Sequence, residues 1–307
     1  MDAHAYDDLE SDRRYKVGIL LALGAGMMFG TYGVFFRLVE DATVWHILLY
    51  RVAAILVVAT GYLVIRYGIE NAISRIFSFG LGIGPVVVVG VAQISINIAF
   101  YRASVAAVMC ILATTPIVAA LLARVFLSER IKPQTAIGAI LSVIGIGFIV
   151  SGGVVSGSLD GILLAIFGAV TYGGFHVLIR KSASKVDGAA IILQSCLISA
   201  LGGGLGIYLT GDTFSVSVID FTYIFLLGGF SMSGGFILYS IAAPRISAAE
   251  LALFPSIENV LSPVYVWLVV NEVPTPQTLL GAPVVLVGMV IAAWVRKRKV
   301  PVRITGS

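Results

Sequence analysis

Hydrophobic residues form ten long runs, separated by short segments rich in charges and turn residues. Each run has about 20 residues, which is the length an α-helix needs to cross about 30 Å of hydrocarbon. The separating segments, such as Glu40-Asp41 and 271–276, contain the residues that usually end helices. The pattern predicts an all-α integral membrane protein with ten transmembrane helices, at 17–38, 44–65, 79–100, 104–126, 133–151, 160–179, 188–210, 219–243, 248–270 and 276–295.

The second half of the chain repeats the first at a constant offset of 143 positions. Residues 106–150 and 249–293 share one pattern, in which Glu129, Pro133, Gln134, Thr135, Gly138, Ala139 and Gly145 recur as Glu272, Pro276, Gln277, Thr278, Gly281, Ala282 and Gly288. An odd number of spans per half inverts the second half in the membrane relative to the first. We therefore expect two inverted five-helix repeats, at 17–151 and 160–295, and such a pair of repeats is typical of transporters.

The distribution of basic residues predicts that both termini are cytoplasmic. In that orientation 16 of the 20 Lys and Arg residues fall in cytoplasmic segments, as the positive-inside rule requires, and the outer loops at 152–159, 211–218 and 271–275 contain none. Residues 1–16 are polar and acidic, which predicts a disordered cytoplasmic tail and an uncleaved first span. Residues 296–307 form a basic cytoplasmic tail.

Composition narrows the class of protein. The chain is 59% hydrophobic and 12% charged, whereas soluble domains are about 25% charged. The net charge of +4 does not indicate a nucleic-acid partner, because the basic residues are dispersed. Cys110 and Cys196 lie in apolar runs as small buried hydrophobes, and the sequence has no CxxC motif or His/Cys cluster that would hold a metal or cofactor. Without an HExxH motif, paired intramembrane aspartates or a Ser/His pair, we expect no enzyme.

Acidic side chains in the predicted span 248–270 are candidates for substrate binding or ion coupling. Glu258 would lie about 15 Å deep, near the bilayer midplane, where a carboxylate should face a cavity or a partner. Glu250, Phe254 and Glu258 share one helical face. Glu258, and less so Glu250, could contact a substrate amine or take up a coupling proton. Alternatively, Glu258 hydrogen-bonds neighbouring helices or forms an ion pair with Arg51.

Other polar side chains within spans could line a cavity or bond between helices. Gln93, Asn97 and Tyr101 are spaced four residues apart along one predicted helix. Tyr172 and His176 are spaced in the same way on another, although a lone histidine is more often structural than a proton relay. The candidate substrate-binding set is Tyr32, Gln93, Asn97, Tyr172, His176, Tyr239, Glu258 and Asn259. The repeated Glu129 and Glu272 precede new spans, where a carboxylate favours a helix N-terminus, so we expect a structural role.

The chain resembles the drug/metabolite transporter superfamily, and within it the ten-span EamA-type family. The resemblance rests on 97–103 (NIAFYRA), Pro116, 128–130 (SER), 246–250 (ISAAE), Glu258 and Asn271-Glu272, with the glycines that follow. It implies two inverted five-helix repeats around a central cavity and transport without ATP hydrolysis. Arg51 matches an arginine that recurs in the family whatever the substrate. That recurrence favours a structural role over binding of a carboxylate or phosphate. Asn259 replaces a family proline.

These observations predict a secondary transporter of the plasma membrane, in bacteria the inner membrane. The resemblance implies export of small metabolites, such as amino acids or related amphipathic compounds, by alternating access, and coupling to protons is a further hypothesis. Import of a vitamin or a nucleoside-like or cofactor-like solute is an alternative on the same fold. A non-transporting membrane scaffold is an alternative from another class. The sequence does not determine the oligomeric state.

Overall fold

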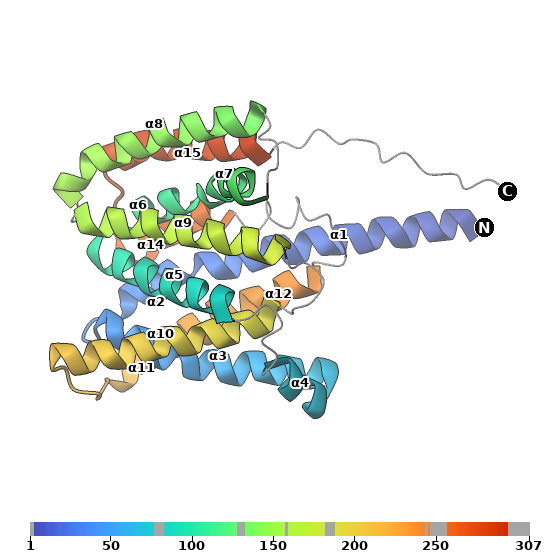
Figure 1. Ribbon diagram of the computed structural model, residues 1–307, viewed down its shortest axis with the longest axis horizontal. Helices are drawn as coiled ribbons and strands as arrows, with labels where there is room; N and C mark the ends of the chain where they lie inside the picture. The colour runs from blue at the N-terminus through green and yellow to red at the C-terminus, as the bar shows by residue number, and fades with distance from the viewer. Residues whose placement is uncertain are drawn as a thin grey trace.

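The computed structural model describes residues 3–76, 83–127, 133–156, 159–181, 188–242, 245 and 257–293. All regular secondary structure in these ranges is helical. The helices lie side by side, roughly along the long axis of the molecule (Figure 1). Their outer surface carries many exposed aliphatic and aromatic side chains, among them Leu201, Val218 and Leu268. Such a surface is typical of a protein whose solvent is lipid.

The helices follow one another without intervening strands in the described ranges. In chain order they are α1 (Ala3–Gly30), α2 (Tyr32–Leu38), α3 (Val44–Tyr67), α4 (Ile69–Ile76), α5 (Ile83–Arg102), α6 (Val105–Leu112), α7 (Thr115–Leu127), α8 (Pro133–Ser156), α9 (Leu159–Lys181), α10 (Gly188–Thr210), α11 (Val218–Leu226), the π-helix η1 (Leu227–Gly234), α12 (Gly235–Ala242), α14 (Glu258–Val270) and α15 (Pro276–Ala293).

Each predicted span coincides with one helix or with consecutive helices of this series. By length and composition, five helical stretches of the described residues can cross a membrane: Arg13–Leu38, Val44–Tyr67, Val105–Phe126, Leu193–Thr210 and Val218–Tyr239. Shorter apolar helices include Val86–Arg102, Leu159–Gly174 and Pro276–Gly288. The chain is therefore a multi-pass membrane protein, and crossing by all ten spans stays a prediction. The end of α15 and the start of α1 lie at the same end of the bundle (Figure 1).

The first 16 residues differ from the expectation of a disordered tail. Helix α1 already begins at Ala3, and it extends beyond the other helices at the end where it starts (Figure 1). A hydrophobic span nucleates the helix, and adding residues to an existing helix is far easier than starting one. Glu10 and Arg14, like Asp12 and Lys16, also have the four-residue spacing that stabilises helices through opposite charges.

Three predicted spans are interrupted in ways that the hydrophobic pattern does not show. The span at 17–38 breaks between α1 and α2 at Thr31, whose hydroxyl donates to the carbonyl of Met28 at 2.7 Å and lies 2.5 Å from Ser231 Oγ. The span at 104–126 breaks between α6 and α7, just before Pro116, which has no N–H to continue the helical ladder. In the third, α11 passes through η1 into α12. π-helical turns often mark functional sites.

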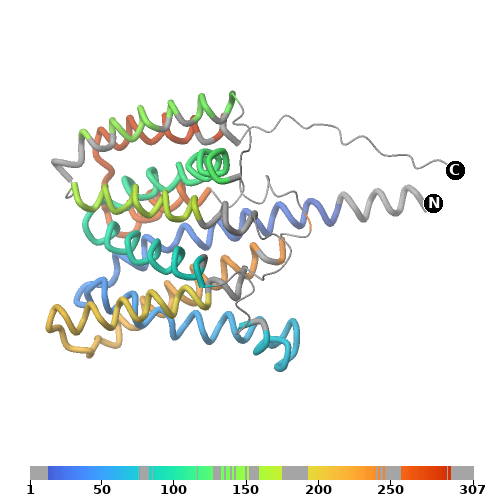
Figure 2. Tube along the Cα trace, in the orientation of Figure 1, coloured from blue at the N-terminus to red at the C-terminus, as the bar shows by residue number. Residues whose placement is uncertain are grey.

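The final helices of the two predicted repeats, α8 and α15, pack along their lengths (Figure 2). Repeated glycines make this contact close. A Cβ added to Gly145 would lie 2.6 Å from Val285 Cγ2 and 2.8 Å from the carbonyl oxygen of Gly281. Gly281 is the repeat mate of Gly138, so these glycines serve helix packing, as the sequence predicts.

Replacing Gly145 by alanine should destabilise the protein by about 1–3 kcal/mol, because α8 and α15 would have to separate. Gly147, two residues along the same helix, has no atom within 4 Å of an added Cβ. Gly147→Ala should therefore be neutral or stabilising by up to about 1 kcal/mol, through helix propensity alone. Thermal unfolding in detergent measures both variants. Equal effects of the two substitutions would contradict the close contact.

Candidate functional site

A single arginine lies at the centre of a buried polar network. Arg51, on α3, is 1% exposed. Its Nη2 donates to Gln93 Oε1 at 2.7 Å and to Ser199 Oγ at 3.2 Å. Its Nη1 donates to the hydroxyl of Tyr32 at 2.9 Å and faces Met232 Sδ at 3.9 Å. The guanidinium thus joins α3 to α2, α5, α10 and η1.

The partners of the guanidinium are themselves fixed by further hydrogen bonds. The Tyr32 hydroxyl donates to Asn97 Oδ1 at 2.5 Å, and Asn97 Nδ2 donates to the carbonyl of Gln93 at 2.6 Å. Gln93 Nε2 donates to Ser195 Oγ at 2.9 Å, and the Cys196 thiol donates to Gln93 Oε1 at 3.6 Å. The acceptor atoms of Tyr32 and Gln93 are therefore held towards Arg51, so that the site is preorganised around a positive charge.

The positive charge of Arg51 has no negative partner among the described residues. All four of its hydrogen-bond partners are neutral, and its Nε has no hydrogen-bond partner at all. A guanidinium is always protonated in proteins. Burying an unpaired charge costs several kcal/mol. The network reduces this cost through hydrogen bonds and leaves the charge itself uncompensated.

A second ionisable group, Glu258, lies in the first turn of α14 and is half-buried. It makes no hydrogen bond or ion pair with another described residue, so the expected alternative of an ion pair with Arg51 is wrong for this structure. Tyr172, on α9, interacts electrostatically with Arg51, Glu258 and Tyr32. Tyr172 therefore lies in the region between the two uncompensated charges.

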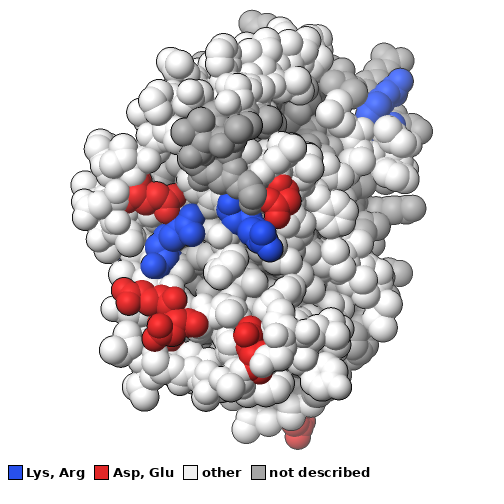
Figure 3. Space-filling view, turned by 90° about the vertical axis from the view of Figure 1, so that its left-hand side faces the viewer, with Lys and Arg blue, Asp and Glu red and all other residues white. Residues whose placement is uncertain are grey.

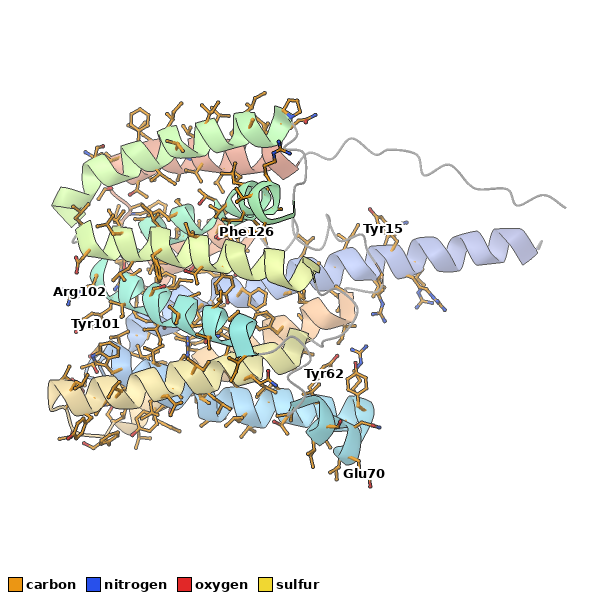
Figure 4. All side chains as sticks on the ribbon, in the orientation of Figure 1. Tyr15, Tyr62, Glu70, Tyr101, Arg102 and Phe126 are labelled. Carbon is orange, nitrogen blue, oxygen red and sulfur yellow. The ribbon has the colours of Figure 1, made fainter. Side chains whose placement is uncertain are left out.

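The remaining candidate residues fall into three groups. Asn259 is buried on α14, and Tyr239 is half-buried on α12. His176 lies on α9, but its side chain is outside the described part, as is the whole of Glu250. Tyr101 does not join Gln93 and Asn97. It is 54% exposed and lies near the outer end of α5 beside Arg102 (Figure 4), because eight residues along a helix do not return to the same angle.

One end of the bundle is closed by an ion pair between the predicted repeats. Arg37, at the end of α2, donates through Nε to Glu272 Oε2 at 2.6 Å and through Nη2 to the carbonyl of Ala103 at 2.7 Å. Glu272 Oε1 accepts the backbone N–H of Val105 at 2.8 Å. We call Arg37, Glu272, Ala103 and Val105 the end clamp. Opposite charges lie side by side on this face of the molecule (Figure 3).

The end clamp refines the expected role of Glu272. The repeat predicts a carboxylate at the start of its own following helix, α15. The structure instead places the carboxylate at the N-terminus of α6, in the other repeat, where the helix dipole favours negative charge. Its repeat mate, Glu129, lies outside the described residues.

The same end contains a buried aspartate that the sequence analysis missed. Asp220, in the first turn of α11, is 2% exposed. Its carboxylate accepts the backbone N–H groups of Glu40, Asp41 and Ala42 at 3.1, 3.1 and 2.8 Å. These bonds hold the loop between α2 and α3 against α11. Asp220 thus fixes the helix that carries Arg51 to the second predicted repeat.

Sequence reasoning also missed the contribution of α10 to the network around Arg51. Ser195 and Ser199 are spaced four residues apart within a predicted span, the same signal that identified Gln93 and Asn97. Hydroxyls of this kind are common in membrane helices, where they can bond to the helix's own backbone. Ser199 does both, because its hydroxyl donates to the carbonyl of Cys196 and accepts from Arg51.

Comparisons with known proteins agree with this architecture. A family model described as the EamA-like transporter family matches residues 16–151 and again residues 159–294. Among curated proteins, none matches the chain. A solved structure described as "Crystal structure of protein" is 17% identical, covers 90% of this chain and 96% of that chain, and has a TM-score of 0.61. That likeness concerns the fold alone.

Tyr32→Phe should destabilise the protein by about 1–3 kcal/mol, because it leaves Arg51 Nη1 and Asn97 Oδ1 each without an oxygen-containing partner. Tyr265→Phe is the matched control, since the Tyr265 hydroxyl has no hydrogen-bond partner among the described residues, and it should change stability much less. Thermal unfolding in detergent compares the two. A larger loss for Tyr265→Phe would refute the central place of the Tyr32 hydroxyl in the network.

Proposed function

Because the chain belongs to the EamA-like transporter family, we propose that it is a secondary transporter of small metabolites in the plasma membrane. The proposed substrates are amino acids or related amphipathic compounds, and the proposed mechanism is alternating access. Export is the direction that the sequence resemblance implies. Uptake of a vitamin-like or nucleoside-like solute would use the same machinery in reverse.

The observation that carries this proposal is the uncompensated charge of Arg51 at the contact between the two family repeats. Arg51, Tyr32, Gln93 and Asn97 belong to the first matched half, whereas Ser195, Ser199 and Met232 belong to the second. Intramembrane ionisable groups are costly and usually mark substrate or ion pathways. Transporter sites lie between repeats, near the middle of the bilayer. A scaffold protein would need no such buried charge.

The end clamp supports alternating access. Arg37 comes from the first matched half and Glu272 from the second, so their ion pair joins the halves at one end. Both side chains are about a quarter exposed, and a contact so close to water can open at moderate cost. In an alternating-access cycle this contact breaks when the halves separate at that end.

Liposomes that contain the protein should exchange labelled amino acids for an unlabelled amino-acid mixture trapped inside. Protein-free liposomes provide the background. Cells that overproduce the protein should also raise the concentration of the same compounds outside, which tests the direction. An absence of exchange for amino acids and for vitamin-like and nucleoside-like solutes would favour the scaffold alternative.

Cross-linking the end clamp should abolish that exchange. In an Arg37→Cys/Glu272→Cys variant, a short bismaleimide would hold the two halves together at this end and prevent the access change. The native thiols, Cys110 and Cys196, are buried, and N-ethylmaleimide on the same variant controls for thiol modification itself. Exchange that persists after complete cross-linking, followed by mass spectrometry, would rule out opening at this end.

A further inference from the structure

We infer that the transported solute is a zwitterion whose anionic group binds at Arg51 and whose cationic group binds at Glu258. This inference rests on the proposed transport function and specifies its substrate class. It starts from the two ionisable side chains that the structure leaves without an opposite charge, one on each matched half of the chain.

The anionic group of the solute is indicated by the unused hydrogen-bonding capacity of Arg51. Nε has no acceptor, and the sulfur of Met232, 3.9 Å from Nη1, is a weak one. Two donors of the guanidinium thus lack an oxygen acceptor. A carboxylate offers two acceptor oxygens and a negative charge, which is the form of ligand that arginine binds most strongly. It would satisfy the donors and neutralise the charge together.

The cationic group of the solute is indicated by Glu258. Its half-buried carboxylate has neither a basic partner nor a hydrogen bond among the described residues. A carboxylate only accepts hydrogen bonds when it is ionised. A primary ammonium group offers three donors and a positive charge, so it complements Glu258 as a carboxylate complements Arg51.

Charge balance distinguishes a zwitterion from other solutes. Arg51 and Glu258 together carry no net charge, but the two charges are separated because they form no ion pair. In a medium of low dielectric constant, a solute of net charge would leave one charge unpaired at a cost of several kcal/mol. A phosphate dianion would add repulsion from Glu258. An α-amino acid adds one charge of each sign and leaves every charge paired.

Tyr172 links the two ends of this site. It interacts electrostatically with both Arg51 and Glu258, so it lies close to the path between them. Asn259, the neighbour of Glu258 on α14, is buried on the same side of the chain's second half. The solute's side chain would extend from this pair of charges, and its identity is not determined by them.

The test compares competitors that differ only in charge. In the exchange assay, each exchanged amino acid would compete against its decarboxylated amine and its N-acetyl derivative. Each derivative loses one charge-assisted interaction of about 1.5–3 kcal/mol, so we expect it to compete about 10–100-fold more weakly. Equal competition by the amine or by the N-acetyl acid would overturn the inference.

Glu258→Gln tests the cationic end without removing the network around Arg51. This variant should bind the amino acid at least about tenfold more weakly and should lose most of the preference over the N-acetyl acid. Glu70→Gln makes the same chemical change at an exposed site on α4, away from Tyr101 and Arg102 (Figure 4), and should keep the native preference. A Glu258→Gln protein that elutes as the native one does and keeps the preference would contradict the inference.

Ligand-dependent thermal stabilisation in detergent, measured with the same three compounds, separates this inference from the proposed function because it needs no flux. Stabilisation by amino acids alone, without exchange, would support the site and refute transport. Exchange of solutes with a single charge or none would support transport and refute the zwitterion site. Stabilisation by all three compounds alike would also refute it.

Discussion

The buried charge of Arg51 is the constraint on which the arrangement of the surrounding helices depends. A guanidinium cannot lose its proton inside a membrane, and lipid offers it no hydrogen bonds. Neighbouring helices must therefore bring acceptors to it, and α2, α5 and α10 do so with Tyr32, Gln93 and Ser199. The α3 backbone is just as confined, since a Cβ on Gly228 of η1 would lie 2.4 Å from the Arg51 carbonyl oxygen.

The two halves of the chain share a framework and differ at the site. Where they match, as at Gly145 and Gly281, the residues serve packing. Arg37 and Glu272 of the end clamp have the repeat mates Arg180 and Glu129, and the α6 N-cap Ser104 has the mate Ser247. A like contact at the opposite end is what the repeat predicts, on side chains outside the described part. Where the halves differ, Arg51 faces no counterpart charge, because its mate is Gln194.

Hydrophobic pattern and repeat were sufficient to predict the family, the helical positions and several members of the polar network. Gln93, Asn97, Tyr32 and Arg51 could be chosen because polar residues inside apolar runs are rare. Their assembly around Arg51 could not be predicted, because it depends on how helices far apart in sequence rotate against each other. Asp220 was missed for a different reason. It lies at the edge of a run, where acidic residues are common, and its importance comes only from the loop that it binds.

The bonds of the network are unequal in a way that suits a rocking motion. Within the first matched half, Arg51, Tyr32, Gln93 and Asn97 are joined by bonds of 2.5–2.9 Å. Contacts to the second half are longer on the whole, from 2.9 Å at Ser195 to 3.9 Å at Met232. Arg51 would thus move with the first half, while Glu258 moves with the second. A zwitterion that contacts both charges would then bridge the halves, which couples its binding to their relative motion.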